Sequence, residues 1–162
     1  MAGCSDDTFG FDGEGTVMLK ATINTDVKVV SRAESQELYD LYAASTNIWI
    51  SRTGSADPSK DGLVRKYVGF DNIPAEGIKL LAGHYVAEAW VGDSVPASFD
   101  KKYFKGYQLF DVTNGSTEEI NLVCKVANTV VSVKYDDDVD LVLKDYTFKV
   151  AHTRGNLTFE GR

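Results

Sequence analysis

The sequence predicts an all-β fold: an antiparallel Greek-key β-sandwich with one short helix. Apolar and polar residues alternate over most of the chain, which is the pattern of strands with one buried face. Turn-forming residues separate these runs at intervals typical of β-sandwiches. Only one stretch, between the first strand and Trp49, has apolar residues at helical spacing.

The first strand is predicted around residues 16–24, where every second residue is apolar, with a short continuation at 27–31. The helix is predicted near 33–44. Ser31 and Glu34 have capping-box spacing there. An ordered loop is the alternative, because the apolar stripe is short: Leu38, Leu41 and Tyr42.

The later apolar runs predict further strands, with Asn72-Ile73-Pro74 ending one of them because proline cannot donate to a ladder. Their expected positions are 48–50, 63–70, 83–90, 108–112, 120–126, 131–135, 146–150 and 157–159. The more apolar faces of the strands predict a mostly buried core set: Leu19, Ile23, Tyr85, Leu122, Cys124, Val131, Val133 and Phe148.

Composition limits the possible functions. The chain has 162 residues and a net charge of -7, and its lysines are scattered singly, so nucleic-acid binding is not expected. The length suits one domain, and we expect a Gly-rich flexible tether at 1–14 followed by a single β-sandwich domain at 15–162. No apolar run is long enough for a transmembrane helix.

The N-terminal string Ala2-Gly3-Cys4-Ser5 resembles the maturation site of a bacterial lipoprotein. The resemblance implies that Cys4 carries the lipid and that the protein is attached through it to a membrane. Only Met1 precedes this string, so we interpret the chain as a mature protein behind an added start residue.

Three further strings resemble surface lipoproteins of Bacteroidetes, in particular the fimbrillin-like family and a related lipoprotein domain family without assigned function. They are Leu80-Leu81-Ala82-Gly83-His84-Tyr85-Val86-Ala87, Tyr103-Phe104-Lys105-Gly106 and Val123-Cys124-Lys125-Val126-Ala127-Asn128. The resemblance covers about residues 15–160, which is most of the chain.

This resemblance implies a transthyretin-like sandwich and a role in adhesion, pilus assembly or pilus anchoring. Cys4-Ser5-Asp6-Asp7 is similar to the tag that sends lipoproteins to the outer face of the outer membrane. Arg32 stands where the family can be processed by a protease, or it is an ordinary surface arginine. Fimbrial subunits of this type usually have two domains, which leaves polymerisation by strand donation open.

The sequence predicts no enzyme and no cofactor. His84 and His152 lack neighbouring metal ligands, and no hydrolase or metalloprotease motif occurs. Asp136, Asp138 and Asp140 alternate as calcium ligands do, but the Gly and Glu of an EF-hand loop are missing, so a solvated acidic turn is favoured.

Aromatic residues offer the remaining candidate ligand contacts. Trp49, Trp90, Tyr67 and Tyr103 form a sugar-stacking platform or, as we favour, belong to the core. Tyr103 and Tyr107, near a loop, are the better exposed candidates for ligand contact.

We therefore expect a surface-exposed, lipid-anchored protein of the outer membrane that acts in adhesion or as a fimbrial component. Its partners would be other fimbrial subunits, or host or glycan ligands. The alternative is a carbohydrate-binding module of a glycan-capture system. An exposed strand edge or apolar groove favours the first function, and coplanar exposed aromatic rings favour the second.

Overall fold

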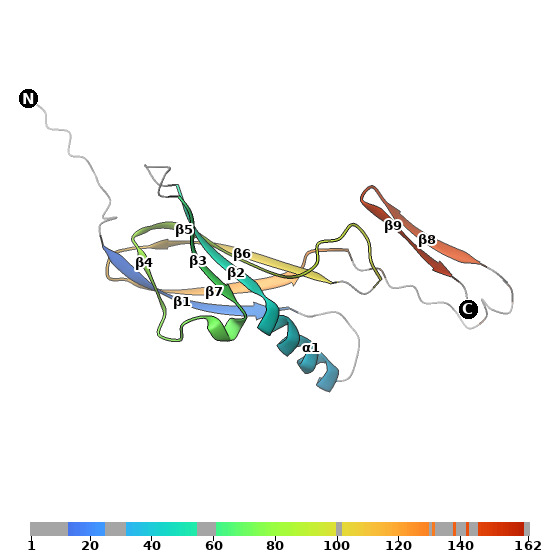
Figure 1. Cartoon of the computed structure of the whole chain (residues 1–162), viewed down its shortest axis with the longest axis horizontal. Helices are drawn as coiled ribbons and strands as arrows, with labels where there is room; N and C mark the ends of the chain where they lie inside the picture. The colour runs from blue at the N-terminus through green and yellow to red at the C-terminus, as the bar shows by residue number, and fades with distance from the viewer. Residues whose placement is uncertain are drawn as a thin grey trace, which may run out of the picture.

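The computed structural model describes residues 13–24, 32–54, 61–99, 102–129, 131, 138, 142 and 146–160. These residues form nine β-strands, one α-helix and one short 3-10 helix (Figure 1). The all-β fold with one short helix is confirmed. The strands are β1 (Glu14–Ile23), β2 (Asn47–Thr53), β3 (Gly62–Val68), β4 (Ile78–Leu81), β5 (Gly83–Gly92), β6 (Tyr103–Val112), β7 (Thr117–Val126), β8 (Thr147–His152) and β9 (Gly155–Glu160).

Seven strands make one curled sheet in the order β3-β2-β5-β6-β7-β1-β4, and β8 and β9 form a separate hairpin. The sheet folds back on itself as a sandwich, with β4-β1-β7 as one layer and β3-β2-β5-β6 as the other. Successive strands often lie in different layers, as in Greek-key connections. The helix α1 (Arg32–Ser45) carries the chain from β1 in one layer to β2 in the other.

One strand pair departs from the expected antiparallel arrangement. β1 and β7 run parallel, from Thr16 opposite Thr117 to Ile23 opposite Cys124. Antiparallel pairing is favoured where a tight turn joins two strands, whereas parallel strands need a long crossover. Five strands separate β1 from β7 in the chain, so no turn dictates their direction.

The two layers join at a corner between β6 and β7. These strands pair only at Phe104 with Val126 and Lys105 with Lys125. Gly106 follows directly, and a Cβ added to it would lie 2.3 Å from the backbone oxygen of Val123. The absent side chain therefore lets β7 pass close to β6 where the sheet bends.

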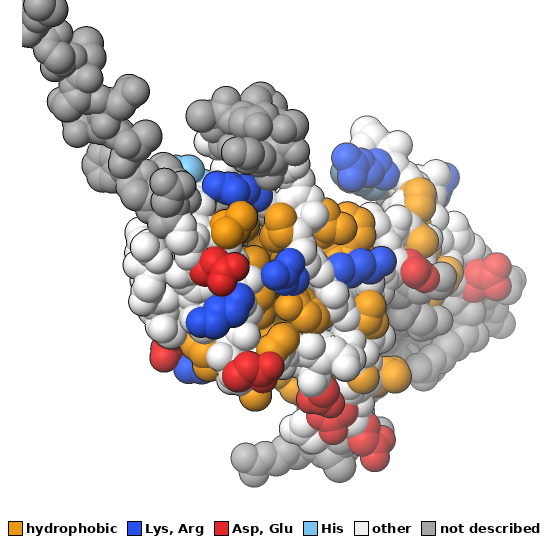
Figure 2. All heavy atoms as spheres, turned by 60° about the vertical axis from the view of Figure 1, so that its left-hand side comes forward, with side chains coloured by type: hydrophobic (Ala, Val, Ile, Leu, Met, Phe, Trp, Pro, Cys, Tyr) orange, Lys and Arg blue, Asp and Glu red, His pale blue; other side chains and the backbone are white. Residues whose placement is uncertain are grey.

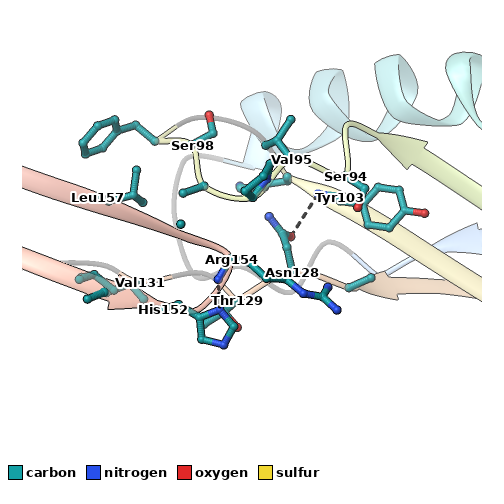
Figure 3. Close-up of a pocket in the computed structure, with 18 of the residues that line it drawn as sticks. Ser94, Val95, Ser98, Tyr103, Asn128, Thr129, Val131, His152, Arg154 and Leu157 are labelled. Atoms are coloured by element: carbon teal, nitrogen blue, oxygen red, sulfur yellow. Dashed lines mark hydrogen bonds between the residues drawn. The ribbon is translucent and has the colours of Figure 1, made fainter.

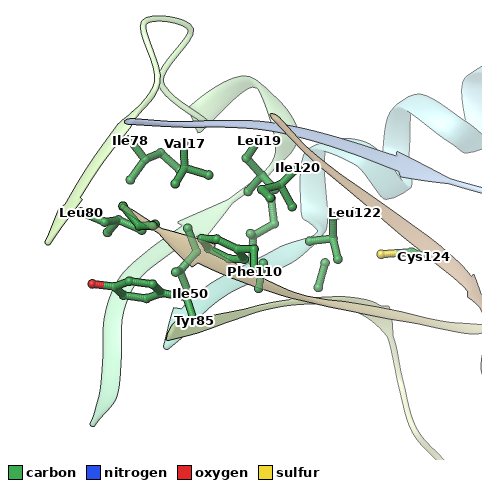
Figure 4. Close-up of a cluster of buried hydrophobic side chains, with 14 of the residues drawn as sticks. Val17, Leu19, Ile50, Ile78, Leu80, Tyr85, Phe110, Ile120, Leu122 and Cys124 are labelled. Atoms are coloured by element: carbon green, nitrogen blue, oxygen red, sulfur yellow. The ribbon is translucent and has the colours of Figure 1, made fainter. Parts of the chain in front are cut away.

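The core lies between the two layers (Figure 4). Alternate residues of β1, β2, β5 and β7 point into it, as the sequence periodicity predicts. Five of the eight predicted core residues are confirmed as buried: Leu19, Ile23, Tyr85, Leu122 and Cys124.

The prediction of burial is wrong for two residues, and a third, Val133, lies outside the described residues. Val131 is 42% exposed and Phe148 is 46% exposed. Phe148 belongs to the β8–β9 hairpin, which is not part of the sandwich, and a two-stranded ribbon has too little partner surface to bury its apolar side chains.

The predicted helix is confirmed as α1, while several strand limits differ from those expected. β4 was not predicted, and β6 begins at Tyr103 rather than near Gln108. The expected strand at 27–31 lies outside the described residues, as does most of 131–135. The run expected to end at residue 70 stops at Val68, and the 3-10 helix η2 (Phe70–Asn72) follows.

Gly13 and Glu14, the last two residues of the expected tether, belong to the sandwich, and β1 begins at Glu14. The Ala82 N–H donates to the Gly13 oxygen and the Gly115 N–H to the Glu14 oxygen, each at 2.8 Å. Gly13 and Glu14 are thus held by the sandwich. Residues 1–12 lie outside the described part of the chain.

Candidate functional site

A pocket lies between one end of the sandwich and the β8–β9 hairpin (Figure 3). It has a volume of about 840 Å³. We call it the hairpin pocket. Its lining comes from the loop after β5 (residues 94–99), the start of β6 (102, 103 and 105), the end of β7 and beyond (127–129 and 131), and the hairpin (150–152, 154, 155, 157 and 159).

The sandwich wall of the pocket is fixed by the backbone around Tyr103. Its N–H donates to Oδ1 of Asn128 at 3.1 Å, and its oxygen accepts from the Ala127 N–H at 2.8 Å. At the base of the loop, Gly92 has φ 85°, and a Cβ there would lie 2.0 Å from the Lys102 oxygen. Only glycine fits this turn without strain, so the loop leaves β5 in a defined direction.

The hairpin wall is held by contacts with the loop after β5. A Cβ added to Gly155 would lie 2.9 Å from the Ala97 Cβ, so the two segments approach closely. The rings of Phe99 and Phe159 meet edge to face with their centroids 5.1 Å apart, and Phe148 lies 6.2 Å from Phe159. The Phe99–Phe159 contact is therefore an apolar link between the loop and the hairpin.

The described lining of the pocket is basic. It includes Lys102, Lys105, His152 and Arg154, and no Asp or Glu. The chain as a whole has the opposite balance, with 24 Asp and Glu against 17 Lys and Arg. Lys105 is partly compensated, because its Nζ lies 3.3 Å from Oε1 of Glu88.

The two tyrosines predicted as ligand contacts do not share a site. Tyr103 lines the hairpin pocket, where its ring lies on the side nearer the sandwich (Figure 3). Tyr107 is 69% exposed on the outer face of β6, opposite Glu88 of β5. Four residues along a strand span about 13 Å, which separates the two rings.

The two tryptophans occupy the outer face of the same layer, so the interpretation of them as core residues is wrong. Trp49 and Trp90 are half-buried, and their rings meet edge to face at 4.8 Å and 77°. The Nζ of Lys66 lies 5.7 Å from the Trp49 ring centre. Their rings are not coplanar and do not form a flat sugar platform. Tyr67, in contrast, packs against the core as expected.

A second feature, the open side of the sandwich, was not predicted from the residue patterns. β3 and β4 are the two ends of the strand order. Between them Nη2 of Arg65 donates to the Lys79 oxygen at 3.1 Å. Leu63, Val68 and Leu81 are 51%, 46% and 54% exposed. On the face seen in Figure 2, hydrophobic side chains gather between Lys, Arg, Asp and Glu side chains.

The structure does not test the two predicted modification sites. Cys4 lies outside the described residues, and lipidation there stays a prediction. Arg32 is the first residue of α1, and its cleavage also stays a prediction.

No group of three or more potential metal ligands occurs among the residues that the structure describes. Of the three alternating aspartates only Asp138 is described, so the calcium question is untested. Nδ1 of His84 lies 2.6 Å from Oδ1 of Asp111 on the exposed surface. Burial raises the pKa of the Cys124 thiol to about 11, which keeps it protonated and unreactive at neutral pH.

The part of the chain that is described contains no helix of the length and hydrophobicity needed to span a membrane.

These features define a β-sandwich domain with an appended hairpin and a basic pocket between them. Residues 13–162 match a family described as a domain of unknown function (DUF4493), and the chain belongs to this family. No curated protein and no solved structure is similar enough to the chain to count as a match.

Proposed function

We propose that this protein is a surface-exposed lipoprotein of the outer membrane, anchored through Cys4, that acts in adhesion or as a fimbrial component. The observation that carries the proposal is that the N-terminal strand and the hairpin pocket lie at opposite ends of the molecule. β1 begins at one end of the sandwich, and the β8–β9 hairpin and its pocket lie at the opposite end (Figure 1).

This arrangement of the two ends suits an anchored protein that makes contacts away from the membrane. A lipid on Cys4 would hold the end of the sandwich where β1 starts close to the bilayer. Residues 5–13 can span at most roughly 30 Å when fully extended. The hairpin end would then be the part of the domain farthest from the lipid surface. The proposal assigns the protein no catalytic role and no cofactor.

The open side of the sandwich supports a fimbrial role in particular. β3 has no strand partner on its outer side within the described sheet, and its apolar residues Leu63 and Val68 are about half exposed. An unpaired edge of this kind can accept a strand from another subunit, whose backbone extends the ladder. Replacing both residues with lysine would place charges along this edge and disfavour such pairing.

Cells that display the protein from its own lipoprotein leader would test the adhesion proposal. Displaying cells should attach to host-cell or glycan-coated surfaces more than cells with the Cys4→Ser variant, which releases the domain. Equal attachment by both strains would refute an adhesive role.

A fimbrial role predicts high-molecular-weight assemblies at the surface. The variant with both Leu63→Lys and Val68→Lys should lose these assemblies while the monomer stays folded.

A carbohydrate-binding module is the second candidate, and the hairpin pocket is the observation that favours it. The pocket has the volume of a small-ligand site and combines hydroxyl, amide and aromatic groups, including Ser94, Asn128 and Tyr103. Glycan-array binding by the soluble domain would support this function. Loss of that binding when Tyr103 is replaced with alanine would assign it to the pocket.

A further inference from the structure

We propose that the hairpin pocket binds a carboxylated saccharide. The inference rests on the second candidate function, carbohydrate binding in this pocket, and names the class of saccharide; it requires neither the lipid anchor nor the edge of β3. It is based on the charge of the pocket, its apolar wall and its supply of hydrogen-bonding groups.

Charge indicates an anionic ligand. Lys102 and Arg154 both line the pocket, the first just before β6 and the second in the turn between β8 and β9. No carboxylate is found among the described lining residues, in a chain that is acidic overall. An arginine guanidinium matches a carboxylate with two parallel hydrogen bonds, and a lysine adds a second positive charge.

The shape and remaining groups indicate a sugar rather than a simple anion. Phe99, which is 61% exposed, and Leu157 give the pocket an apolar side on which the flat face of a sugar ring can pack. Ser94 and Thr129 add hydroxyl groups that can exchange hydrogen bonds with sugar hydroxyls. A volume of about 840 Å³ exceeds what one inorganic anion needs and suits a short oligosaccharide.

The pocket is also bounded by two separately held walls. On the sandwich side, the backbone of Tyr103 is held by hydrogen bonds with the Asn128 side chain and the Ala127 N–H. On the other side, the Phe99–Phe159 contact links the loop to the hairpin. Walls held in place before binding lose less conformational entropy when the ligand arrives.

Calorimetric titration of the soluble chain of residues 1–162 tests the proposal, with trigalacturonate as the probe and its methyl ester as the uncharged match. We expect trigalacturonate to bind and the ester to bind at least about tenfold more weakly. Arg154→Gln and Lys102→Gln should each weaken trigalacturonate binding by about tenfold. Lys20→Gln, which removes an exposed lysine of β1 paired with Glu119, should leave it unchanged.

Every other outcome overturns the proposal. Equal binding of acid and ester would show a site for neutral sugars. Equal weakening by Lys20→Gln and Arg154→Gln would show non-specific charge attraction. Binding of hexaglutamate in preference to trigalacturonate would show a site for acidic peptides, and absence of trigalacturonate binding at millimolar concentration would remove the sugar site. Membrane anchoring at Cys4 could still hold in each case, so the two proposals fail separately.

Discussion

The thiol of Cys124 is unreactive because of its place in the core. It is fully buried on β7, and burial raises the pKa of its thiol from 9.0 to about 11. A thiol with so high a pKa in a dry environment carries almost no thiolate at neutral pH. The residue therefore acts as a small apolar core group.

Two results follow for a Cys4→Ser variant, in which Cys124 is the only thiol. A thiol-reactive dye at pH 8 should label Cys124 only when denaturant unfolds the protein, and rapid labelling of the folded protein would contradict its burial.

The folded state also holds the thiol proton more tightly than the unfolded state. Its contribution to stability is complete below about pH 9 and is lost as the pH rises from 9 to about 11. Denaturation midpoints across this range would show the loss.

Leu122 and Leu109 provide a matched test of the two faces of the sandwich. Leu122 is fully buried in β7, whereas Leu109 is 62% exposed on β6. Leu122→Ala should lower the free energy of unfolding by about 2 to 5 kcal/mol, because it leaves a cavity between the layers. Leu109→Ala should change it by less than about 1 kcal/mol. Equal costs in urea denaturation would mean that the assigned faces are wrong.

Residue patterns identified the buried faces of the central strands but not the fate of every aromatic side chain. The alternation in β5 predicted the burial of Tyr85, and the structure confirms it. The same alternation places Trp90 on the other face, where it packs with Trp49 outside the core. Sequence reasoning missed this because large aromatic residues suit a core and an outer cross-strand pair equally well.

At the level of elements, Gly106 explains how one continuous sheet becomes two layers. It follows the short β6–β7 contact and leaves room for the Val123 backbone, which a Cβ would approach to 2.3 Å. The close approach is to backbone atoms, which cannot rotate away as a flexible side chain can. β7 would have to shift before any larger residue fitted.

We expect Gly106→Ala to destabilise the fold by about 1 to 3 kcal/mol, the range typical of overpacking. Gly115→Asn is the matched control. Gly115 has φ 73°, which asparagine tolerates, and nothing lies within 4 Å of its added Cβ. Thermal denaturation of both variants would measure the difference. If Gly106→Ala lowers the stability no more than the control does, the corner can accommodate a side chain and the account of Gly106 is contradicted.

Elements with strong periodicity were predicted, and those without it were not. β1, β5 and α1 lie close to their expected ranges. β4 is only four residues long, too short for a pattern to emerge. The start of β6 was missed because Gly106 interrupts its apolar face. The role of the β8–β9 hairpin as one wall of a pocket depends on long-range contacts such as Phe99 with Phe159, which no local pattern encodes.

At the level of the whole molecule, the arrangement of the ends connects the anchoring and binding proposals. β1 starts at the end away from the hairpin, so a lipid on Cys4 and a ligand in the hairpin pocket would lie at opposite ends of the domain. Neither would obstruct the other. β3, the strand with the open edge, contributes no residue to the described lining of the pocket.

Metabolic labelling with a fatty-acid analogue, followed by membrane fractionation, tests the anchoring most directly. The protein would be expressed in a Bacteroidetes host from a lipoprotein leader, beside its Cys4→Ser variant. We predict that the unaltered protein takes up the label and sediments with membranes, while the variant is unlabelled and soluble, because it lacks the thiol to which the lipid would be attached. An unlabelled soluble protein with Cys4 intact, or a membrane-bound variant without it, would contradict lipid anchoring at this residue.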